Sequence, residues 1–345
     1  MFLDAFISLP ILSFFALPWL SSYSTSLNLL FFYMTWSILV LSYPPLKVEI
    51  IGTLMSRTVF YLAPALFFLL IDALIPSVAV NLKAHGEVSL PGRLGGKRLA
   101  KVVGVSLLNL SLGIALQAGV ELVLKAFHIR SALKITTSLP LPWTMFMDIV
   151  WALGIRGILA YYIHRFILHG PSRNRLSPAH LHRTWCHSLS APFSLASNYD
   201  HPIPYLLHRW IPLYFPAYLF RYHILTFQLL VIITSLEEVF VYSGYGSALL
   251  PGTIVVNRMA RRADAHYLSN KGNTGNFGGI GVLDWMHGTG VQGSTDVTED
   301  AADEMEKHDL QGKIDRAGDS MGDVMENMGG KLKGRGKRGS RAKNG

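Results

Sequence analysis

Long apolar runs separated by short polar stretches fill most of the first 245 residues of this chain. An α-helix needs about 20 apolar residues to cross a hydrocarbon core about 30 Å thick. Runs close to that length cover residues 27–43, 59–80, 102–124 and 143–163. The pattern predicts an all-α integral membrane protein with multiple transmembrane helices and a helical, polar segment after the last of these runs.

Two further apolar stretches fit the pattern of a spanning helix less well. Residues 2–20 contain Asp4 and two prolines, and they form either a first spanning helix or a signal-like segment; no basic residues precede them, which disfavours cleavage. Residues 203–220 contain three prolines, which favours a shallow position in the membrane. Together with residues 223–242 they are expected to dip into the membrane as a hairpin.

Composition and charge agree with a membrane protein. The chain of 345 residues is 50% hydrophobic and 15% charged, whereas soluble domains carry about 25% charged residues. Cys186 is the single cysteine, so no internal disulfide forms, and a reducing compartment fits. Residues 1–295 carry 21 basic and 11 acidic residues. This excess suits contact with anionic lipid headgroups, and no basic soluble domain indicates nucleic-acid binding.

Basic residues also predict the orientation of the helices. The loop over residues 81–101 contains five Lys and Arg residues against one acid, which places it in the cytosol. The run 102–124 then leads outward and the run 143–163 leads back. The residues that follow, beginning with His164, are therefore expected on the cytosolic side.

Three regions follow from these patterns. Residues 1–140 are expected to form an N-terminal transmembrane region, and residues 141–295 a helical domain that contains most of the histidines. Residues 296–345 are polar, first acidic and then Gly-rich and basic, and they are expected to form a disordered cytosolic tail.

Histidines are concentrated in the middle region. Ten of the thirteen lie between His164 and His287. Imidazole is the commonest metal ligand near neutral pH, so the cluster indicates one metal site or two adjacent ones. The alternative is that histidines occupy the polar ends of membrane helices and bind nothing.

The spacing of these histidines is informative. His164 and His169 are five positions apart, as are His182 and His187. Five steps on an α-helix turn by about 140°, so such a pair does not share one face. The spacing therefore predicts ligands from a helix end or a distorted turn, or ligands of two metals.

The donor types narrow the chemistry. A set rich in imidazole and poor in thiolate and carboxylate suits iron or zinc. Asp200 precedes His201 and Asp264 lies two positions before His266; each is expected either to orient a neighbouring imidazole or to cap a turn. No G-x-S-x-G or H-E-x-x-H motif of common hydrolases is present.

Four motifs occur in a specific order: Y-Y-I-H-R-F-I-L-H at 161–169, L-H-R-T-W-C-H-S at 181–188, N-Y-D-H-P at 198–202 and D-A-H-Y at 264–267. On these motifs the chain resembles the fatty acid hydroxylase/sterol desaturase superfamily, in a fungal-type branch with degenerate histidine boxes. The resemblance covers roughly residues 145–290.

The resemblance implies a non-haem di-iron oxidoreductase, with zinc as the other possible metal. It implies O2-dependent hydroxylation or desaturation of a lipid or sterol in lipid biosynthesis at the endoplasmic reticulum, with electrons from a cytochrome b5-type donor. The metal ligands implied by the matching positions are His164, His169, His182, His187, His201 and His266.

The chain departs from the family pattern at several expected ligands. Cys186 stands where the first of two paired histidines is usual, and Tyr242 stands before Ser-Gly-Tyr where a histidine is usual. The third box usually reads His-Asp-x-His-His, and here only His266 of its three histidines is present, followed by Tyr267. Cys186 and the two tyrosines are possible substitute ligands, and His208, His223 and His287 are possible compensating ones.

Two alternatives to an oxidase stay open. The first is a degenerate relative that acts as a lipid-binding or scaffold membrane protein. The second is an unrelated metal transporter, whose ligands would lie in broken helices at midmembrane. The second is disfavoured, because His164 and the histidines beyond it follow an apolar run rather than lying within one.

Overall fold

The computed structural model describes residues 25–172, 174–189, 191–245, 254–268, 275–291 and 319–320. These residues form helices and turns, with an isolated bridge between Lys134 and His223 and no β-strand within the described ranges. The prediction of an all-α protein is therefore confirmed. The apolar stretch 2–20, and the tail 296–345 apart from residues 319–320, lie outside the described residues.

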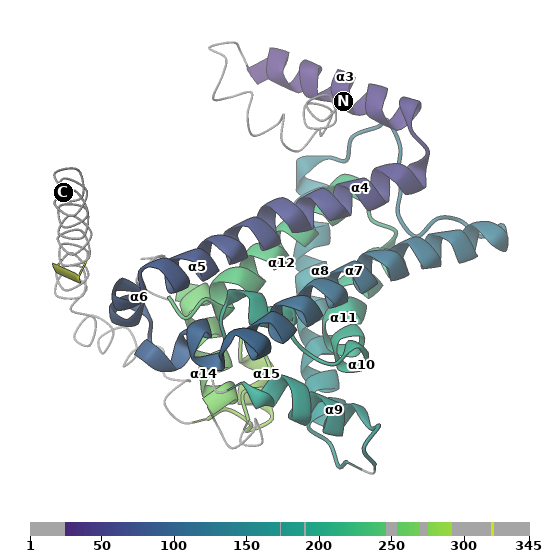
Figure 1. Cartoon of the computed structure of the whole chain (residues 1–345). Coiled ribbons are helices and arrows are strands. Elements are labelled where there is room, and N and C mark those ends of the chain that lie inside the picture. Colours follow the sequence, from purple (N-terminus) through teal and green to yellow (C-terminus); the bar gives the residue numbers. More distant parts are fainter. Residues whose placement is uncertain are drawn as a thin grey trace, which may run out of the picture. The chain divides into compact units, whose positions relative to one another are not determined.

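The described helices are shown in chain order from purple to yellow in Figure 1. The first half contains α3 (Thr25–Ser42), α4 (Pro45–Arg57), η1 (Thr58–Leu62), α5 (Ala63–Leu74), α6 (Pro76–Leu82), η2 (Gly86–Ser89), η3 (Pro91–Leu94) and α7 (Gly96–Ala126). Next come α8 (Pro142–Tyr162), η4 (Ile163–Leu168), α9 (Pro178–Trp185), η5 (Cys186–Ser188) and η6 (Ser194–Asn198). The last are α10 (Pro202–Tyr205), η7 (Leu206–Trp210), α11 (Ile211–Phe220), α12 (Ile224–Tyr242), α14 (Ile254–Leu268) and α15 (Val282–Met286).

Among the described residues, four helical stretches are long and apolar enough to cross a membrane, namely Pro45–Leu74, Gly96–Ala126, Pro142–Leu168 and Ile224–Tyr242. Large apolar side chains are exposed along them; in Pro142–Leu168, Trp143 is 69% exposed and Trp151 is 62% exposed. Such surfaces are stable in lipid, because a helix satisfies its backbone groups internally and apolar side chains contact the acyl chains. The predicted integral membrane class with several spanning helices is thus confirmed.

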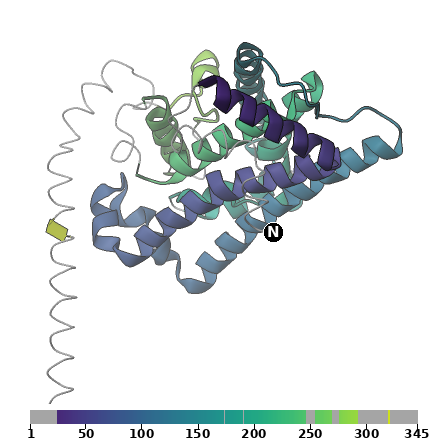
Figure 2. The same ribbon diagram turned by 90° about the horizontal axis from the view of Figure 1, so that it is seen from above.

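The bounds of some spans differ from those expected. The run predicted over residues 59–80 begins earlier, at Pro45, because α4 continues through η1 into α5 (Figures 1 and 2). It ends at Leu74 because Pro76, which has no backbone N–H to donate, begins α6 as a separate helix. The run predicted over residues 27–43 lies in α3, within which the described residues Asn28–Ser42 form an apolar helix.

The hairpin expected to dip into the membrane is built differently in its two arms. Residues 203–220 fall into three short pieces, α10, η7 and α11, with Pro216 inside the last. The second arm forms α12, a 19-residue helix that is long and apolar enough to cross. Its length and composition allow this arm to cross the membrane, and the expected position of the hairpin stays a prediction.

The chain divides into two compact units that alternate along the sequence. Unit 1 comprises residues 1–64, 105–186 and 198–238, and unit 2 comprises residues 65–104, 187–197 and 239–345. The three sequence regions proposed above stay a prediction.

Unit 1 has its core around the first half of α12. Phe227, Leu230 and Val231 are fully buried there and pack with Trp36 and Tyr214. Within the same unit α8 packs on α11, and α9 packs on both η4 and α10 (Figure 1). This packing brings the end of α8 next to α9, where the first histidines lie.

Unit 2 contains a buried ion pair inside otherwise apolar helices. The Lys83 Nζ donates to Asp72 Oδ2 at 2.6 Å and to the Ser89 carbonyl at 3.0 Å. The Tyr245 hydroxyl donates to the other Asp72 oxygen at 2.6 Å. An acid in a membrane-length helix is costly unless it is paired, and these contacts join α5, the residues after α6 and the residues after α12.

Candidate metal centre

The first two histidines lie on a π-helical turn that continues α8. In η4 the His169 backbone N–H donates to the His164 carbonyl at 2.9 Å, which is an i to i+5 bond. A π-turn places residues five apart on successive turns, whereas an α-helix would point them away from each other. The two imidazole centroids are consequently 4.9 Å apart, and the distorted turn predicted from the spacing is present.

The third histidine comes from α9. Ser177 caps this helix by accepting from the His180 N–H at 3.3 Å, and Pro178 begins it. Arg183 fixes α9 to the end of η4, because its Nη2 donates to the carbonyls of His169 and Gly170 at 3.0 and 2.9 Å. His182 on the same helix is buried.

Unit 1 therefore holds three converging imidazoles. The His182 ring centroid lies 5.4 Å from that of His164 and 5.2 Å from that of His169. Each residue has a ring nitrogen within 4.8 Å of the others. Three imidazoles at this separation form a set that can bind one transition-metal ion.

A fourth imidazole joins this cluster. His208 lies in η7, another π-helical segment, and its ring centroid is 4.5 Å from that of His164. The sequence indicated His208 only as one of several possible compensating ligands, because no motif surrounds it. Its place beside His164 depends on the fold of residues 198–210, which the local sequence pattern does not reveal.

Asp200 orients His182. Its Oδ2 accepts from His182 Nδ1 at 2.5 Å, and its Oδ1 accepts from the His201 backbone N–H at 2.7 Å. A neutral imidazole that donates from Nδ1 carries its lone pair on Nε2, the atom available to a metal. Cys186 is also buried here, and ligand atoms of His182, Cys186 and Asp200 lie within 4.8 Å of one another.

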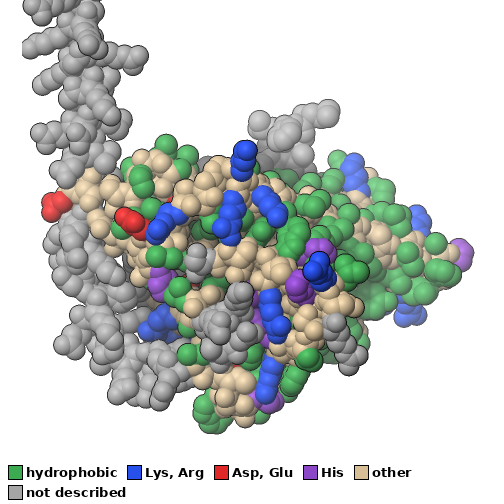
Figure 3. All heavy atoms as spheres, turned by 60° about the horizontal axis from the view of Figure 1, so that its bottom comes forward, with side chains coloured by type: hydrophobic (Ala, Val, Ile, Leu, Met, Phe, Trp, Pro, Cys, Tyr) green, Lys and Arg blue, Asp and Glu red, His purple; other side chains and the backbone are tan. Residues whose placement is uncertain are grey.

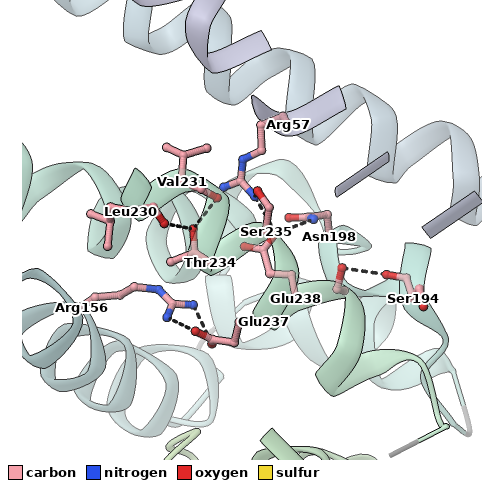
Figure 4. A network of polar contacts seen from close by, with 11 residues as sticks. Arg57, Arg156, Ser194, Asn198, Leu230, Val231, Thr234, Ser235, Glu237 and Glu238 are labelled. Atoms are coloured by element: carbon pink, nitrogen blue, oxygen red, sulfur yellow. Dashed lines mark hydrogen bonds and ion pairs between the residues drawn. The ribbon is translucent and has the colours of Figure 1, made fainter. Parts of the chain in front are cut away.

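A polar network ties this segment to the membrane helices of unit 1. Asn109 on α7 donates to the backbone carbonyls of Asn198 and Asp200, both at 2.9 Å. The Asn198 amide donates to Glu238 on α12 at 3.1 Å, and Glu238 also accepts from Arg57 on α4 at 2.8 Å (Figure 4). The backbone around Asp200 is thus held by three helices.

The neighbouring acid on α12 makes a different contact. Glu237 accepts two hydrogen bonds from Arg156 on α8, at 2.7 and 3.0 Å (Figure 4). Adjacent carboxylates therefore bind arginines from different helices, and α12 is fixed to both α4 and α8.

Three other histidines that the sequence indicated as possible ligands, His201, His223 and His287, are not members of these histidine clusters. His201 caps α10, since its Nδ1 accepts from the Ile203 N–H at 3.2 Å, and its ring packs on Trp185. His223 packs on Trp36, and burial lowers its pKa. His287 is exposed, and its Nδ1 lies 2.8 Å from the Leu283 carbonyl.

In unit 2, His187 and His266 form a second pair of imidazoles. Their ring centroids are 4.9 Å apart, and they have ring nitrogens within 4.8 Å of each other. The Tyr267 ring lies 5.5 Å from that of His187, and the Tyr242 ring lies 6.0 Å from that of Tyr267. The two tyrosines at expected histidine positions are thus gathered beside this pair.

A loop organised by Asp284 orients His266. Asp284 is fully buried and accepts from the backbone N–H groups of Phe277 and Gly278 and from the Arg262 guanidinium. The loop presents the Gly275 carbonyl to His266 Nδ1 at 2.8 Å. Nδ1 therefore donates, and the Nε2 lone pair of His266 is available to a metal.

Asp264 contacts a different histidine from the one that its position suggested. Its Oδ2 lies 3.1 Å from His85 Nε2. Side chains two positions apart on a helix do not face each other, so Asp264 and His266 leave α14 in different directions. The hydrogen bond from Asp264 raises the pKa of His85, whereas burial raises the pKa of Asp264 itself.

Residues 149–289 match the family model described as Fatty acid hydroxylase. This segment belongs to the fatty acid hydroxylase/sterol desaturase superfamily. The match includes α8 from Ile149, all the histidines of both units' clusters and the loop organised by Asp284. No solved structure matches the chain.

Membership of the hydroxylase superfamily assigns the chain to a coarse functional class. The family consists of membrane oxidoreductases of the lipid hydroxylase and desaturase type, and the histidine clusters of both units are compatible with the metal chemistry of such enzymes. The fold and the family therefore agree with the resemblance recognised in the sequence.

Proposed function

We propose that the chain is a membrane-bound, non-haem iron oxidoreductase that hydroxylates or desaturates a lipid or sterol-like substrate with O2, in lipid biosynthesis. The observation that supports this most is the buried cluster of His164, His169 and His182 at the end of a membrane-length helix, within the hydroxylase segment. His208 extends this cluster.

The donor set fits the metal. Neutral imidazoles with few carboxylates suit iron, and zinc is the other candidate. Asp200 and the Gly275 carbonyl each engage an Nδ1 atom, so His182 and His266 present Nε2. We assign one metal ion to the cluster in unit 1 and ligands of a second ion to His187 and His266 in unit 2.

Bound iron would supply the activation of O2 that breaks an unactivated C–H bond. Hydroxylation converts R–H, O2, two electrons and two protons into R–OH and H2O; desaturation removes two hydrogens and releases two H2O. The chain's own residues bind and orient the ligating imidazoles in a buried setting. We propose a cytochrome b5-type protein as the one-electron donor.

The proposed location is the endoplasmic reticulum membrane, with the histidine clusters facing the cytosol. The basic residues between α6 and α7 favour a cytosolic position for that loop. Because the exposed apolar side chains of the spanning helices contact acyl chains, we expect a hydrophobic substrate to enter from the bilayer.

The first test is the metal content of the full-length protein, purified in detergent from cells grown with iron and measured by elemental mass spectrometry. The expected result is about two iron ions per chain. His164→Ala and His187→Ala should lower the iron content and abolish turnover while the protein stays in the membrane. His180→Ala is the matched control, because His180 lies on α9 outside both clusters.

The contrary outcome also has a defined meaning. Wild-type protein without metal above background, or full turnover in both His164→Ala and His187→Ala, would overturn the proposal. The replacement of expected histidines by Cys186, Tyr242 and Tyr267 would then favour the alternative of a degenerate lipid-binding or scaffold membrane protein. Lipid and sterol profiles of a deletion strain separate these two functions.

A further inference from the structure

A cavity of about 300 Å³ lies in unit 2, and its lining does not include His187 or His266. Its lining combines Arg93 and Arg98 with Val88, Leu90, Leu94 and the buried Phe193. The first five come from the connection between α6 and α7 and the first turn of α7, and Phe193 comes from the segment before η6. Two guanidinium groups beside an apolar wall suit a ligand that is both anionic and apolar.

The cavity lies at one end of a candidate span. α7 begins at Gly96, and the helix from Gly96 to Ala126 is apolar enough to cross a membrane. Lys97, Arg98 and Lys101 are exposed in its first two turns. Cationic side chains at the end of a span lie at headgroup level, so the cavity opens where phospholipid headgroups are found.

The charge around the cavity is strongly positive. Arg93, Lys97, Arg98 and Lys101 are all exposed, and the nearby acid Glu87 contacts Arg93 only at 4.0 Å with both side chains largely in solvent. On the face shown in Figure 3, Lys and Arg side chains are more numerous than Asp and Glu among the described residues. An anion entering this region is attracted by these four cationic side chains.

The two arginines are held differently. Arg93 is more than half exposed, and it lies 4.0 Å from the acid Glu87. The Arg98 Nη2 donates to the Ser188 backbone carbonyl, in the residue that follows His187. Arg98 is thereby oriented at the cavity wall, and its remaining N–H groups suit a phosphate oxygen, which guanidinium binds through two parallel hydrogen bonds.

We infer that this cavity binds the phosphodiester headgroup of an anionic phospholipid, with Arg93 and Arg98 on the phosphate and Leu94 and Phe193 against the glycerol and upper acyl region. The inference does not depend on the proposed oxidase activity. It gives the basic end of α7 a specific lipid ligand in addition to general attraction to the membrane surface.

The test measures equilibrium binding of short-chain dioctanoyl phosphatidylglycerol to the full-length protein in a non-ionic detergent. Arg93→Gln and Arg98→Gln should each weaken binding by about tenfold, the effect of losing one charge-assisted contact. Lys97→Gln and Lys101→Gln each remove one positive charge from α7, the helix that carries Arg98, without touching the cavity wall. They should change the affinity by less than about twofold.

A cavity-filling variant separates shape from charge. Leu94→Trp keeps every basic residue but occupies the cavity, and it should weaken binding as much as the arginine variants do. Arg98→Lys keeps the charge but loses the planar pair of N–H donors, so its affinity for the lipid should lie between those of the wild type and of Arg98→Gln. An unchanged elution profile and iron content in these variants show that the fold and the histidine clusters are intact.

Three results would overturn the inference. Equal weakening by all four Gln variants would show diffuse attraction and no cavity site. Equal affinity for dioctanoyl phosphatidylcholine would remove the selectivity for anionic lipid. Displacement of the lipid by inorganic phosphate at matching concentration would identify a free phosphate as the ligand.

Discussion

His182 and Asp200 are 18 positions apart in the sequence, and their side chains meet with 2.5 Å between Nδ1 and Oδ2. The carboxylate fixes the imidazole tautomer, and the backbone of Asp200 is in turn held by Asn109. Orientation of a ligand by such a partner commonly contributes 10-fold to 100-fold to metal affinity.

The first prediction concerns this contact. Asp200→Asn should lower the iron affinity of the protein by about 10-fold to 100-fold, because an amide accepts more weakly and does not fix Nδ1 as a donor. Competition with a calibrated chelator measures the change. Asp148→Asn on α8 is the control; equal losses in both variants would show that Asp200 acts through net charge alone.

The second prediction concerns His208. Its ring lies 4.5 Å from that of His164, so His208→Ala should lower the iron content and shift the visible absorption of the iron-loaded protein. His180→Ala removes an imidazole from α9 and should change neither. Unchanged spectra in His208→Ala would exclude it as a ligand and leave it as a packing residue.

The third prediction concerns Cys186, which is buried with ligand atoms of His182 and Asp200 within 4.8 Å. Cys186→His restores the usual family residue and should keep or raise the metal content. Cys186→Ala should lower it if the thiolate binds metal. A clear loss in Cys186→His together with retention in Cys186→Ser would instead show that the site is built around a small side chain.

The fourth prediction concerns the Lys83–Asp72 pair, in which both side chains are almost fully buried. Lys83→Met should destabilise the protein by about 3–5 kcal/mol, because the buried Asp72 loses its cationic partner inside an apolar helix and keeps only the hydrogen bond from Tyr245. The double variant with Asp72→Asn should recover part of this loss. Unfolding in mixed detergent, followed by circular dichroism, measures both.

The exposed pair Arg93 and Glu87 is the control for the comparison of the single and double variants of Lys83 and Asp72. Because both side chains are largely in solvent, Glu87→Gln should change the free energy of unfolding by less than about 1 kcal/mol. Additive effects of Lys83→Met and Asp72→Asn would contradict a coupled pair.

The fifth prediction concerns Gly275, whose carbonyl orients His266. Gly275 has a φ of +137°, and a Cβ there would lie 2.1 Å from the Thr289 carbonyl oxygen. Gly275→Ala should therefore displace the loop and lower the iron content. Limited proteolysis of the loop reports the displacement directly.

Gly288 in the same loop is the matched control. It also has a positive φ, of 62°, but nothing lies within 4 Å of a Cβ there. Gly288→Ala should cost only the conformational penalty of about 1–2 kcal/mol. If both alanine variants behave alike, the close approach to Thr289 has no role in holding the loop.

The sequence by itself determined the class of the protein. The length and spacing of the apolar runs predicted helices, because a helix of about 20 apolar residues crosses a bilayer with its backbone groups satisfied internally. The spacing of His164 and His169 predicted a distorted turn, and the motifs from residue 161 onward predicted the family. Each of these properties depends on residues that are close together in the sequence, so the sequence alone predicts it.

Only the tertiary structure decided which side chains meet. The i to i+5 hydrogen bond of η4 brings His169 beside His164, and the packing of α9 and η7 adds His182 and His208. His201, which the resemblance implied as a ligand, caps α10 through Nδ1, and its role as a ligand stays a prediction. These contacts depend on segments distant in sequence and on turn geometries that residue types do not specify, so the sequence supplied the donors and the fold selected among them.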